Sequence, residues 1–284
     1  MEMLCQFGPV TVLFSQLPAS PVWPFWQWKL NPFQVKTGDP DLVVGYHAQP
    51  VTPEGAPLWE DISLQVCRQV YGLADGKVLW QQTDRTTGQL QLQFLVSADY
   101  QEITLTQDLS PTSGMGALEA LTFLIYYAFL HRQVLTFHGA LVEGDGKGFL
   151  LCAASGVGKT THARLWRDHK NALILNGDRA TCYEKDGKWF GFGTPWCGTS
   201  GEYLNRSVPL QAAVVLQRGT QNRVSKASPM ALLSHGVYPA WDRHLTEAML
   251  TLLNRFLETI PVLLLECTPD TDAVDALQQA LEHV

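Results

Sequence analysis

Hydrophobic positions follow two different patterns before and after residue 110. Residues 89–95 alternate apolar and polar side chains, and with the apolar run at 78–81 they predict a hairpin. A further strand is expected at 100–105. Prolines interrupt short extended pieces through the first 60 residues. These patterns predict a small β-rich N-terminal region over residues 1–110.

After residue 110, strand patterns alternate with helical ones. Residues 117–132 are apolar around most of a helical circumference, which predicts a buried helix. The dipeptides Asp145-Gly146 and Asp186-Gly187 each lie between two apolar runs, which is typical of β-hairpins. This order predicts an α/β domain over residues 111–284. Its expected strands are 134–143, 147–152, 172–175, 179–183, 188–192, 212–216 and 262–266, with helices at 161–169, at 242–259 and after a cap at Thr268.

One segment carries a specific chemical signal. Residues 153–161 read Ala-Ala-Ser-Gly-Val-Gly-Lys-Thr-Thr and lie between the apolar run 149–152 and a helical pattern. Glycines allow successive N–H groups to face phosphate oxygens, the helix N-terminus adds partial positive charge, and lysine neutralises phosphate. Ala153 replaces the first glycine of the full pattern, so the match is to a relaxed form. We predict that a nucleoside triphosphate is bound by Ser155, Gly156, Val157, Gly158, Lys159, Thr160 and Thr161.

Two further residues could carry chemistry near this loop. Asp178 follows the predicted strand 172–175 and, with the Thr160 hydroxyl, is expected to hold Mg²⁺. The alternative is an ordinary turn, because Asn-Gly-Asp is a favourable turn sequence. His138 precedes Gly139 on the strand before the loop, where it is either a base for the acceptor or a hydrogen-bonded core residue.

The segment 193–202 is a second concentration of glycine and hydroxyl groups, and it is expected to form a loop over the ligand. Glu202 is a candidate metal ligand or base, and Arg206 could stabilise a transferring phosphoryl group. The alternative is a plain connecting loop. Arg218, Arg223 and Arg243 either bind phosphate or lie on the surface. His162 and His235 have no interpretable partner in the sequence.

Charge and cysteine usage narrow the class of protein. A net charge of −7 disfavours binding to nucleic acids or anionic membranes. The six cysteines lack Cys-x-x-Cys spacing, which indicates reduced thiols and argues against a structural zinc site. The N-terminus lacks a basic secretory segment, and the longest apolar run, 120–130, is too short to span a bilayer. We therefore expect a cytoplasmic protein.

Three motifs in order resemble a known enzyme family. His138-Gly139, the Ser155–Thr160 loop and the turn Asn176-Gly177-Asp178-Arg179 resemble the catalytic core of HPr kinase/phosphorylase and its relatives, which share a fold with ATP-dependent phosphoenolpyruvate carboxykinase. Residues 260–270 resemble the C-terminus of HPr-kinase-like proteins in bacterial cassettes. The resemblance covers about residues 134–284. It implies a P-loop core with a mixed sheet, and an ATP- and Mg²⁺-dependent kinase that phosphorylates a hydroxyl of a small molecule or of a peptide serine.

Two departures from that family bear on its chemistry. The family commonly has two adjacent acids where this chain has Gly177-Asp178, and Lys-Thr-Thr replaces the usual Lys-Ser-Glu. HPr itself is therefore not the expected substrate. The alternative is a catalytically inactive nucleotide-binding module that recognises a peptide or protein partner. The sequence leaves open the phosphoryl acceptor, the preference for ATP or GTP, and the oligomeric state.

Overall fold

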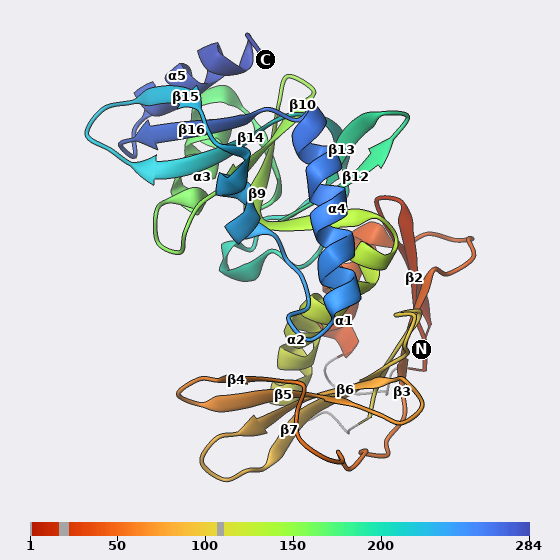
Figure 1. Ribbon diagram of the computed structural model, residues 1–284. Coiled ribbons are helices and arrows are strands. Elements are labelled where there is room, and N and C mark those ends of the chain that lie inside the picture. Colours follow the sequence, from red (N-terminus) through yellow and green to blue (C-terminus); the bar gives the residue numbers. More distant parts are fainter. Residues whose placement is uncertain (1, 17–22, 107–110) are drawn as a thin grey trace. The chain divides into compact units, whose positions relative to one another are not determined.

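The computed structural model describes residues 2–16, 23–106 and 111–284 (Figure 1). The chain forms two compact units, of which unit 1 contains Met1–Arg132 and Pro239–Thr246 and unit 2 contains Gln133–Tyr238 and Glu247–Val284. The boundary expected at residue 110 falls on residues 107–110, which lie outside the described residues. Helix α2 (Pro111–His131), which begins just after it, belongs to unit 1 by its contacts.

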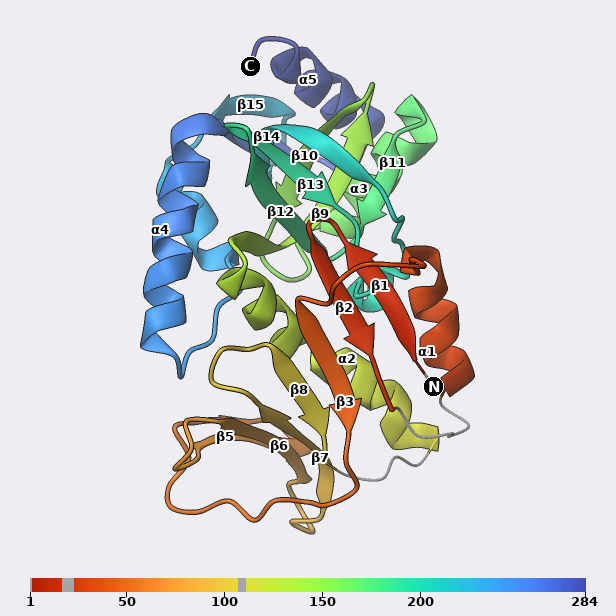
Figure 2. The ribbon, with the colours of Figure 1, turned by 90° about the vertical axis from the view of Figure 1, so that its right-hand side faces the viewer.

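Unit 1 is built on an eight-stranded mixed sheet in the order β1-β2-β3-β8-β7-β6-β5-β4 (Figure 2). Strands β2, β3 and β8 run parallel to one another, whereas the other neighbours pair antiparallel. The predicted hairpin is confirmed as the pair β6–β7. The strands are β1 (Met3–Phe7), β2 (Val10–Phe14), β3 (Leu42–Tyr46), β4 (Trp59–Ile62), β5 (Val66–Gly72), β6 (Val78–Asp84), β7 (Leu90–Val96) and β8 (Glu102–Leu105).

Aromatic side chains join the helices of unit 1 to its sheet. Phe129 of α2 lies 6.2 Å from Phe7 between ring centroids, and Trp26 of α1 (Trp23–Leu30) lies 6.4 Å from Phe14. A short 3-10 turn, η1 (Asn31–Phe33), follows α1. Trp241, from the segment that returns to unit 1, packs against Trp59 and Tyr127. The core of unit 1 therefore uses residues from two distant parts of the chain.

The strands of unit 2 form a second mixed sheet, part of which closes on itself. β10 pairs antiparallel with β9 and parallel with β14, so the hydrogen-bonded path β10-β9-β12-β13-β14 returns to β10. β16 and then β15 extend the sheet from β14, and β11 pairs with β9. These strands are β9 (Val134–Gly144), β10 (Lys147–Cys152), β11 (Leu173–Asn176), β12 (Arg179–Lys185), β13 (Lys188–Phe192), β14 (Ser207–Arg218), β15 (Arg223–Lys226) and β16 (Val262–Cys267).

Both Asp-Gly dipeptides form the hairpin turns that the sequence predicts. Asp145 and Gly146 have φ of 52° and 77°, and Asp186 and Gly187 have φ of 52° and 72°. Positive φ at both central residues matches the right-handed twist of the flanking strands. These turns fix the register of β9 with β10 and of β12 with β13.

Helices cover unit 2 on both sides of its sheet (Figure 2). The helices α3 (Lys159–Lys170) and α5 (Thr271–Leu281) bury Trp166 and Leu277 in one core with strands β9, β10, β14 and β16. Phe256 of α4 (Arg243–Thr259) instead contacts Phe137 and Trp189. Within the described ranges, no helix is long and apolar enough to cross a membrane.

The cap predicted for the last helix is wrong by two residues. Asp270, not Thr268, is the N-cap of α5, and its carboxylate accepts a hydrogen bond from the amide of Ala273 at 3.1 Å. The Thr268 hydroxyl donates to Asp270 at 2.5 Å instead. An N-cap side chain must reach an amide two or three positions into the helix, which Asp270 does and Thr268 is too early to do.

Two glycines leave room for the side chains enclosed by the ring of strands. A Cβ placed on Gly148 of β10 would lie 2.5 Å from Cγ1 of Val208, and one placed on Gly191 of β13 would lie 2.7 Å from Cδ1 of Leu141. Both distances are far below an ordinary van der Waals contact. Close packing of the ring therefore requires glycine at both positions.

We expect Gly148→Ala to lower the free energy of unfolding by about 1–3 kcal/mol, because the new methyl group meets the stiff, β-branched side chain of Val208. Urea denaturation of the variant measures the loss. Val208→Ala in the same chain should recover part of it, so the double variant should lose less than the sum of the two single variants. Strictly additive losses would contradict this packing.

His162 is buried on the first turn of α3, with 3% of its surface exposed. Neither ring nitrogen has a hydrogen-bond partner within the part of the chain that the structure describes. Burial lowers the pKa of His162 to about 4, because the charged imidazolium would lose its hydration. The folded protein therefore keeps this ring neutral in a pH range where the unfolded chain protonates it.

We expect His162 to make the protein sensitive to acid. Below about pH 6.5 the unfolded chain binds a proton that the folded protein takes up only near pH 4, so stability falls as pH decreases through this window. The loss reaches about 3 kcal/mol at ~1.4 kcal/mol per pKa unit. Chemical denaturation at several pH values should show a weaker decrease for His162→Phe than for the wild type. Parallel curves for the two proteins would refute this assignment.

Candidate functional site

The glycine-rich segment predicted to bind phosphate connects β10 to α3 as a loop over residues 153–158. Gly156 and Gly158 have φ of 77° and 127°, which side-chain-bearing residues rarely adopt. A Cβ built on either glycine would have no atom within 4 Å. The backbone conformation therefore requires these glycines, and the space beside them is open. Gly158 is the N-cap of α3 and provides no side-chain cap to the first turn of the helix.

Two pockets flank this loop. The larger, about 580 Å³, is lined by Ser155 and its neighbours, by the end of β14, and by Ser234 and His235 of η3 (Pro229–His235). The smaller, about 420 Å³, is lined by Thr161 and His162 of α3 and by residues 267–269. Gly156 and Val157 contribute to both pockets.

Arg218, at the end of β14, also lines both pockets. Its guanidinium donates hydrogen bonds to the carbonyl oxygens of Gly156 and, at 3.4 Å, of Val157. These bonds hold the carbonyl groups of the loop on the side of Arg218. Of the three arginines that the sequence left undecided, Arg218 is therefore the one that contacts the loop.

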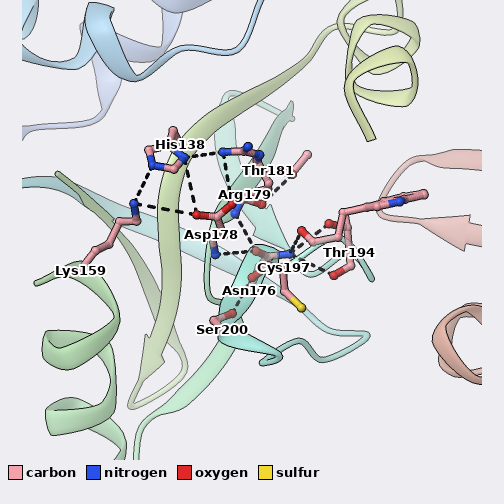
Figure 3. A network of polar contacts seen from close by, with 10 residues as sticks. His138, Lys159, Asn176, Asp178, Arg179, Thr181, Thr194, Cys197 and Ser200 are labelled. Carbon is pink, nitrogen blue, oxygen red and sulfur yellow. Dashed lines mark hydrogen bonds and ion pairs between the residues drawn. The ribbon is translucent and has the colours of Figure 1, made fainter. Parts of the chain in front are cut away.

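Lys159, His138 and Asp178 meet at the start of α3 (Figure 3). Lys159 is buried, with 8% of its surface exposed, and its Nζ lies 2.9 Å from Nε2 of His138 and 4.0 Å from Oδ1 of Asp178. Nδ1 of His138 lies 3.6 Å from the same carboxylate oxygen. The three side chains come from β9, from α3 and from the turn after β11, so the fold assembles them from distant parts of unit 2.

Arg179 is a fourth member of this cluster. Its Nη1 lies 3.3 Å from Oδ2 of Asp178 and contacts Nδ1 of His138. The cluster thus combines two cationic side chains with one carboxylate, and it keeps a positive charge while the histidine is neutral. Such a balance favours an anionic ligand.

Burial and the neighbouring cations shift the protonation of this cluster. Burial, with the charge of Lys159, lowers the pKa of His138 below its ordinary value and keeps the ring neutral at pH 7. Burial also lowers the pKa of Lys159, whereas the Asp178 carboxylate opposes that shift. The pKa of His235 is lowered by burial and by Lys159, so this histidine also feels the charge of the cluster.

Asn176 holds the turn that carries Asp178 and Arg179 (Figure 3). Its fully buried side-chain oxygen accepts hydrogen bonds from the amides of Asp178 and Arg179 at 2.9 and 2.7 Å. Its amide nitrogen donates to the carbonyl and the hydroxyl of Thr194 and to the carbonyl of Trp196, at 3.0 to 3.1 Å. Every polar atom of the side chain is used, so this turn and the 194–196 segment share one anchor.

No side chain fits at position 177, where the HPr kinase family commonly has an acid. A Cβ on Gly177 would lie 2.2 Å from Oγ of Ser200, and the Gly177 amide donates to the carbonyl of Glu202 at 3.0 Å. Ser200 therefore occupies the space that a second acid would need. Gly139 is similarly confined, because its Cβ would lie 2.9 Å from Sγ of Cys152.

Glu202 and Arg206, predicted to take part in catalysis, each have an ionic partner outside the Lys159 cluster. The Glu202 carboxylate pairs with Arg164 at 3.3 Å and with Arg167 at 2.5 Å, both on α3. Arg206 pairs with Glu143 through two hydrogen bonds of 2.5 and 2.6 Å. The structure thus brings His138, Lys159 and Asp178 together, whereas Glu202 and Arg206 form ion pairs with residues outside this cluster.

Asp178 and the Thr160 hydroxyl are the groups that the sequence predicts to hold Mg²⁺. Among residues 2–16, 23–106 and 111–284, no three His, Cys, Asp or Glu side chains are arranged to hold a metal ion. Asp178 and the Thr160 hydroxyl would supply only part of a ligand set. Mg²⁺ in nucleotide sites commonly keeps water and phosphate oxygens as its remaining ligands, so such a partial set is compatible with Mg²⁺.

Sequence reasoning gave no role to three residues that the structure places in or beside the site. Asn176 and Arg179 belong to the motif Asn176-Gly177-Asp178-Arg179. From the sequence, this motif indicated only a turn and gave neither side chain a role. His235 lies on η3, and its segment joins β9 through the bridge between Phe137 and Gly236. That bridge links residues 99 positions apart, so no local sequence pattern predicts that His235 lies near the site.

Comparison with known proteins identifies the family. A solved structure, "Structure of the Hpr(Ser) kinase/phosphatase from Coxiella burnetii", is similar at 11% identity with a TM-score of 0.29, over 52% of this chain and 98% of that one. A likeness at this level carries no argument about function. No curated protein matches the sequence. The profile described as "SynChlorMet cassette protein ScmC" matches residues 105–268, more than half of the chain, and the protein therefore belongs to the ScmC family.

Proposed function

We propose that unit 2 binds a nucleoside triphosphate and transfers its γ-phosphoryl group to a hydroxyl. The observation that carries this proposal is the loop at residues 153–158. Its two glycines adopt positive φ beside open space, and it leads into a helix without a side-chain cap and into the buried Lys159. Backbone amides at a helix N-terminus and a lysine together form an anion site suited to phosphate.

In this proposal the loop works as a P-loop for ATP. Lys159 neutralises the outer phosphates, and Ser155, Val157, Thr161 and the two glycines line the path of the phosphate chain. Arg218 holds the carbonyl groups of Gly156 and Val157 to one side. Amides of the loop and of the first turn of α3 would bind the phosphate oxygens. Thr160 and Asp178 would hold Mg²⁺, which supplies charge neutralisation at the phosphate oxygens.

The transfer itself requires an acceptor hydroxyl and a base. The acceptor oxygen forms a bond to the γ-phosphorus while the bond from that phosphorus to the bridging β–γ oxygen breaks, and ADP leaves. The acceptor proton passes to His138 or to Asp178. His138 is suited to this role because its lowered pKa leaves it neutral, and its Nε2 lone pair, which accepts from Lys159 in this structure, becomes available once Lys159 turns to the phosphates. The acceptor is a small molecule or a peptide serine.

One observation favours the alternative of an inactive nucleotide-binding module. The space beside Gly177 is filled by Ser200, so a second acid is absent from this turn. Mass spectrometry of a metabolite and peptide pool incubated with ATP distinguishes the two functions. A new phosphorylated product supports the kinase, and nucleotide binding without any product supports the module.

We expect Lys159→Ala to weaken ATP binding by about tenfold to a hundredfold, because the charge that faces the phosphates is lost. Isothermal titration calorimetry measures the affinity, and circular dichroism checks that the variant is folded. Burial of Lys159 has a desolvation cost, so the variant should keep its structure. Unchanged affinity in the folded variant would contradict the P-loop.

We expect Asp178→Asn to lose Mg²⁺-dependent turnover by about a hundredfold or more, because the carboxylate that faces the metal is neutralised. ATP binding without metal should persist, since Lys159 and the loop amides remain. Turnover at increasing Mg²⁺ concentrations measures the effect. Turnover like that of the wild type would place the metal ligand at another residue.

A further inference from the structure

We propose that Glu202 is a positioning residue that fixes the Asp178 carboxylate for Mg²⁺ through a clamp on helix α3. The clamp consists of Glu202, Arg164 and Arg167. This inference rests on the proposed nucleotide site, and it gives Glu202 a role other than that of metal ligand or base.

The carboxylate end of Glu202 is occupied by the two arginines. Oε2 accepts from Nε of Arg164 at 3.3 Å, and Oε1 accepts from Nη1 of Arg167 at 2.5 Å. Each oxygen therefore has its own guanidinium partner. Arg164 also donates to the carbonyl of Ser200 at 3.4 Å, so α3 holds the segment 200–202 at two points.

The backbone end of Glu202 reaches the turn of Asp178. The Glu202 carbonyl accepts the amide of Gly177 at 3.0 Å, and Tyr203 forms a β-bridge with Asn176. Ser200 lies against Gly177, and its Oγ donates to the carbonyl of Cys197 at 2.6 Å. Gly198 lies against the carboxylate itself, because a Cβ placed on it would lie 2.6 Å from Oδ2 of Asp178.

Helix α3 connects this clamp to the phosphate loop. It begins at Lys159, and Arg164 and Arg167 follow five and eight positions later, about 7.5 and 12 Å along the helix axis. One rigid helix therefore carries the lysine for phosphate and the two arginines that hold Glu202. The segment 198–202 lies between this helix and the turn of Asp178, and it fixes the separation between the phosphate loop and the carboxylate.

Neutralising Glu202 removes both ion pairs and weakens the hold of α3 on this segment, of which only the bond from Arg164 to the Ser200 carbonyl remains, while the loop is unchanged. Gly198 and Ser200 then support the Gly177–Asp178 turn less firmly, and the carboxylate samples more positions. A less fixed carboxylate binds metal more weakly, and the loss of residues that orient metal ligands commonly weakens metal binding by 10–100-fold. Because the arginines are about half exposed, we expect an effect near the lower end, about tenfold.

The test compares Glu202→Gln with Glu184→Gln in the full chain. Glu184 of β12 has a side chain 23% exposed, against 20% for Glu202, but it pairs with Arg255 of α4 and not with α3. Binding of a fluorescent ATP analogue is measured in EDTA and at increasing Mg²⁺ concentrations. For Glu202→Gln, we expect the Mg²⁺ concentration that gives half of the metal-dependent gain in affinity for the ATP analogue to rise about tenfold. Its affinity for the analogue in EDTA should stay within about twofold of that of the wild type. Glu184→Gln should match the wild type in both measurements.

A wild-type Mg²⁺ requirement in Glu202→Gln would overturn the inference, and so would an equal loss of affinity with and without metal. If thermal unfolding shows that Glu202→Gln is not folded, the double variant Arg164→Gln/Arg167→Gln acts on the same clamp from α3. It should raise the Mg²⁺ requirement by a similar factor, and an unchanged requirement overturns the inference. A wild-type protein that binds no nucleotide would instead overturn the proposed function, and this inference with it.

Discussion

The buried side chain of Asn176 is the constraint on which the site depends. It lies at the end of β11 with no exposed surface, and its five hydrogen bonds reach the amides of Asp178 and Arg179 as well as the 194–196 segment. A buried side-chain amide is stabilising only when its polar atoms are hydrogen-bonded. Movement of either segment would therefore leave the oxygen or the nitrogen of the Asn176 side chain without a partner. Asn176 therefore holds the backbone of the turn from which the side chains of Asp178 and Arg179 project.

Around that anchor, the protein keeps charged groups partly away from water. Lys159 is almost fully buried, and its charge is balanced only loosely by a carboxylate 4.0 Å away. Burial of this kind costs free energy, which an arriving anion offsets by supplying the missing negative charge. The hydrogen bond from Lys159 to His138 shows where the lysine rests without such a ligand. The buried, loosely balanced charge of Lys159 is thus consistent with the proposed binding of a phosphate group.

Local patterns in the sequence predicted much of the fold and the centre of the candidate site. The Asp-Gly turns, the helical spacing in α4 and the glycine-rich loop depend on neighbouring residues, so they were visible in the chain. The ring of strands closes where β10 pairs with β14, which joins Gly148 to Leu210. The ion pairs of Glu202 are made with arginines 35 and 38 positions away in the sequence. Contacts of this range are decided by packing of the whole unit, and single-sequence patterns do not encode them.

The return of residues 239–246 to unit 1 has a consequence for dissecting the protein. The polypeptide passes from one unit to the other at three places, after Arg132, Tyr238 and Thr246. A single cut therefore cannot separate the two units: a fragment that ends at Thr246 keeps all of unit 1 but also carries residues 133–238, and one that starts at Gln133 keeps all of unit 2 but also carries residues 239–246. A fragment starting at Gln133 would carry Trp241 stripped of Trp59 and Tyr127, and would expose an indole that the complete chain covers. Expression of unit 2 by itself therefore calls for a short polar linker in place of residues 239–246.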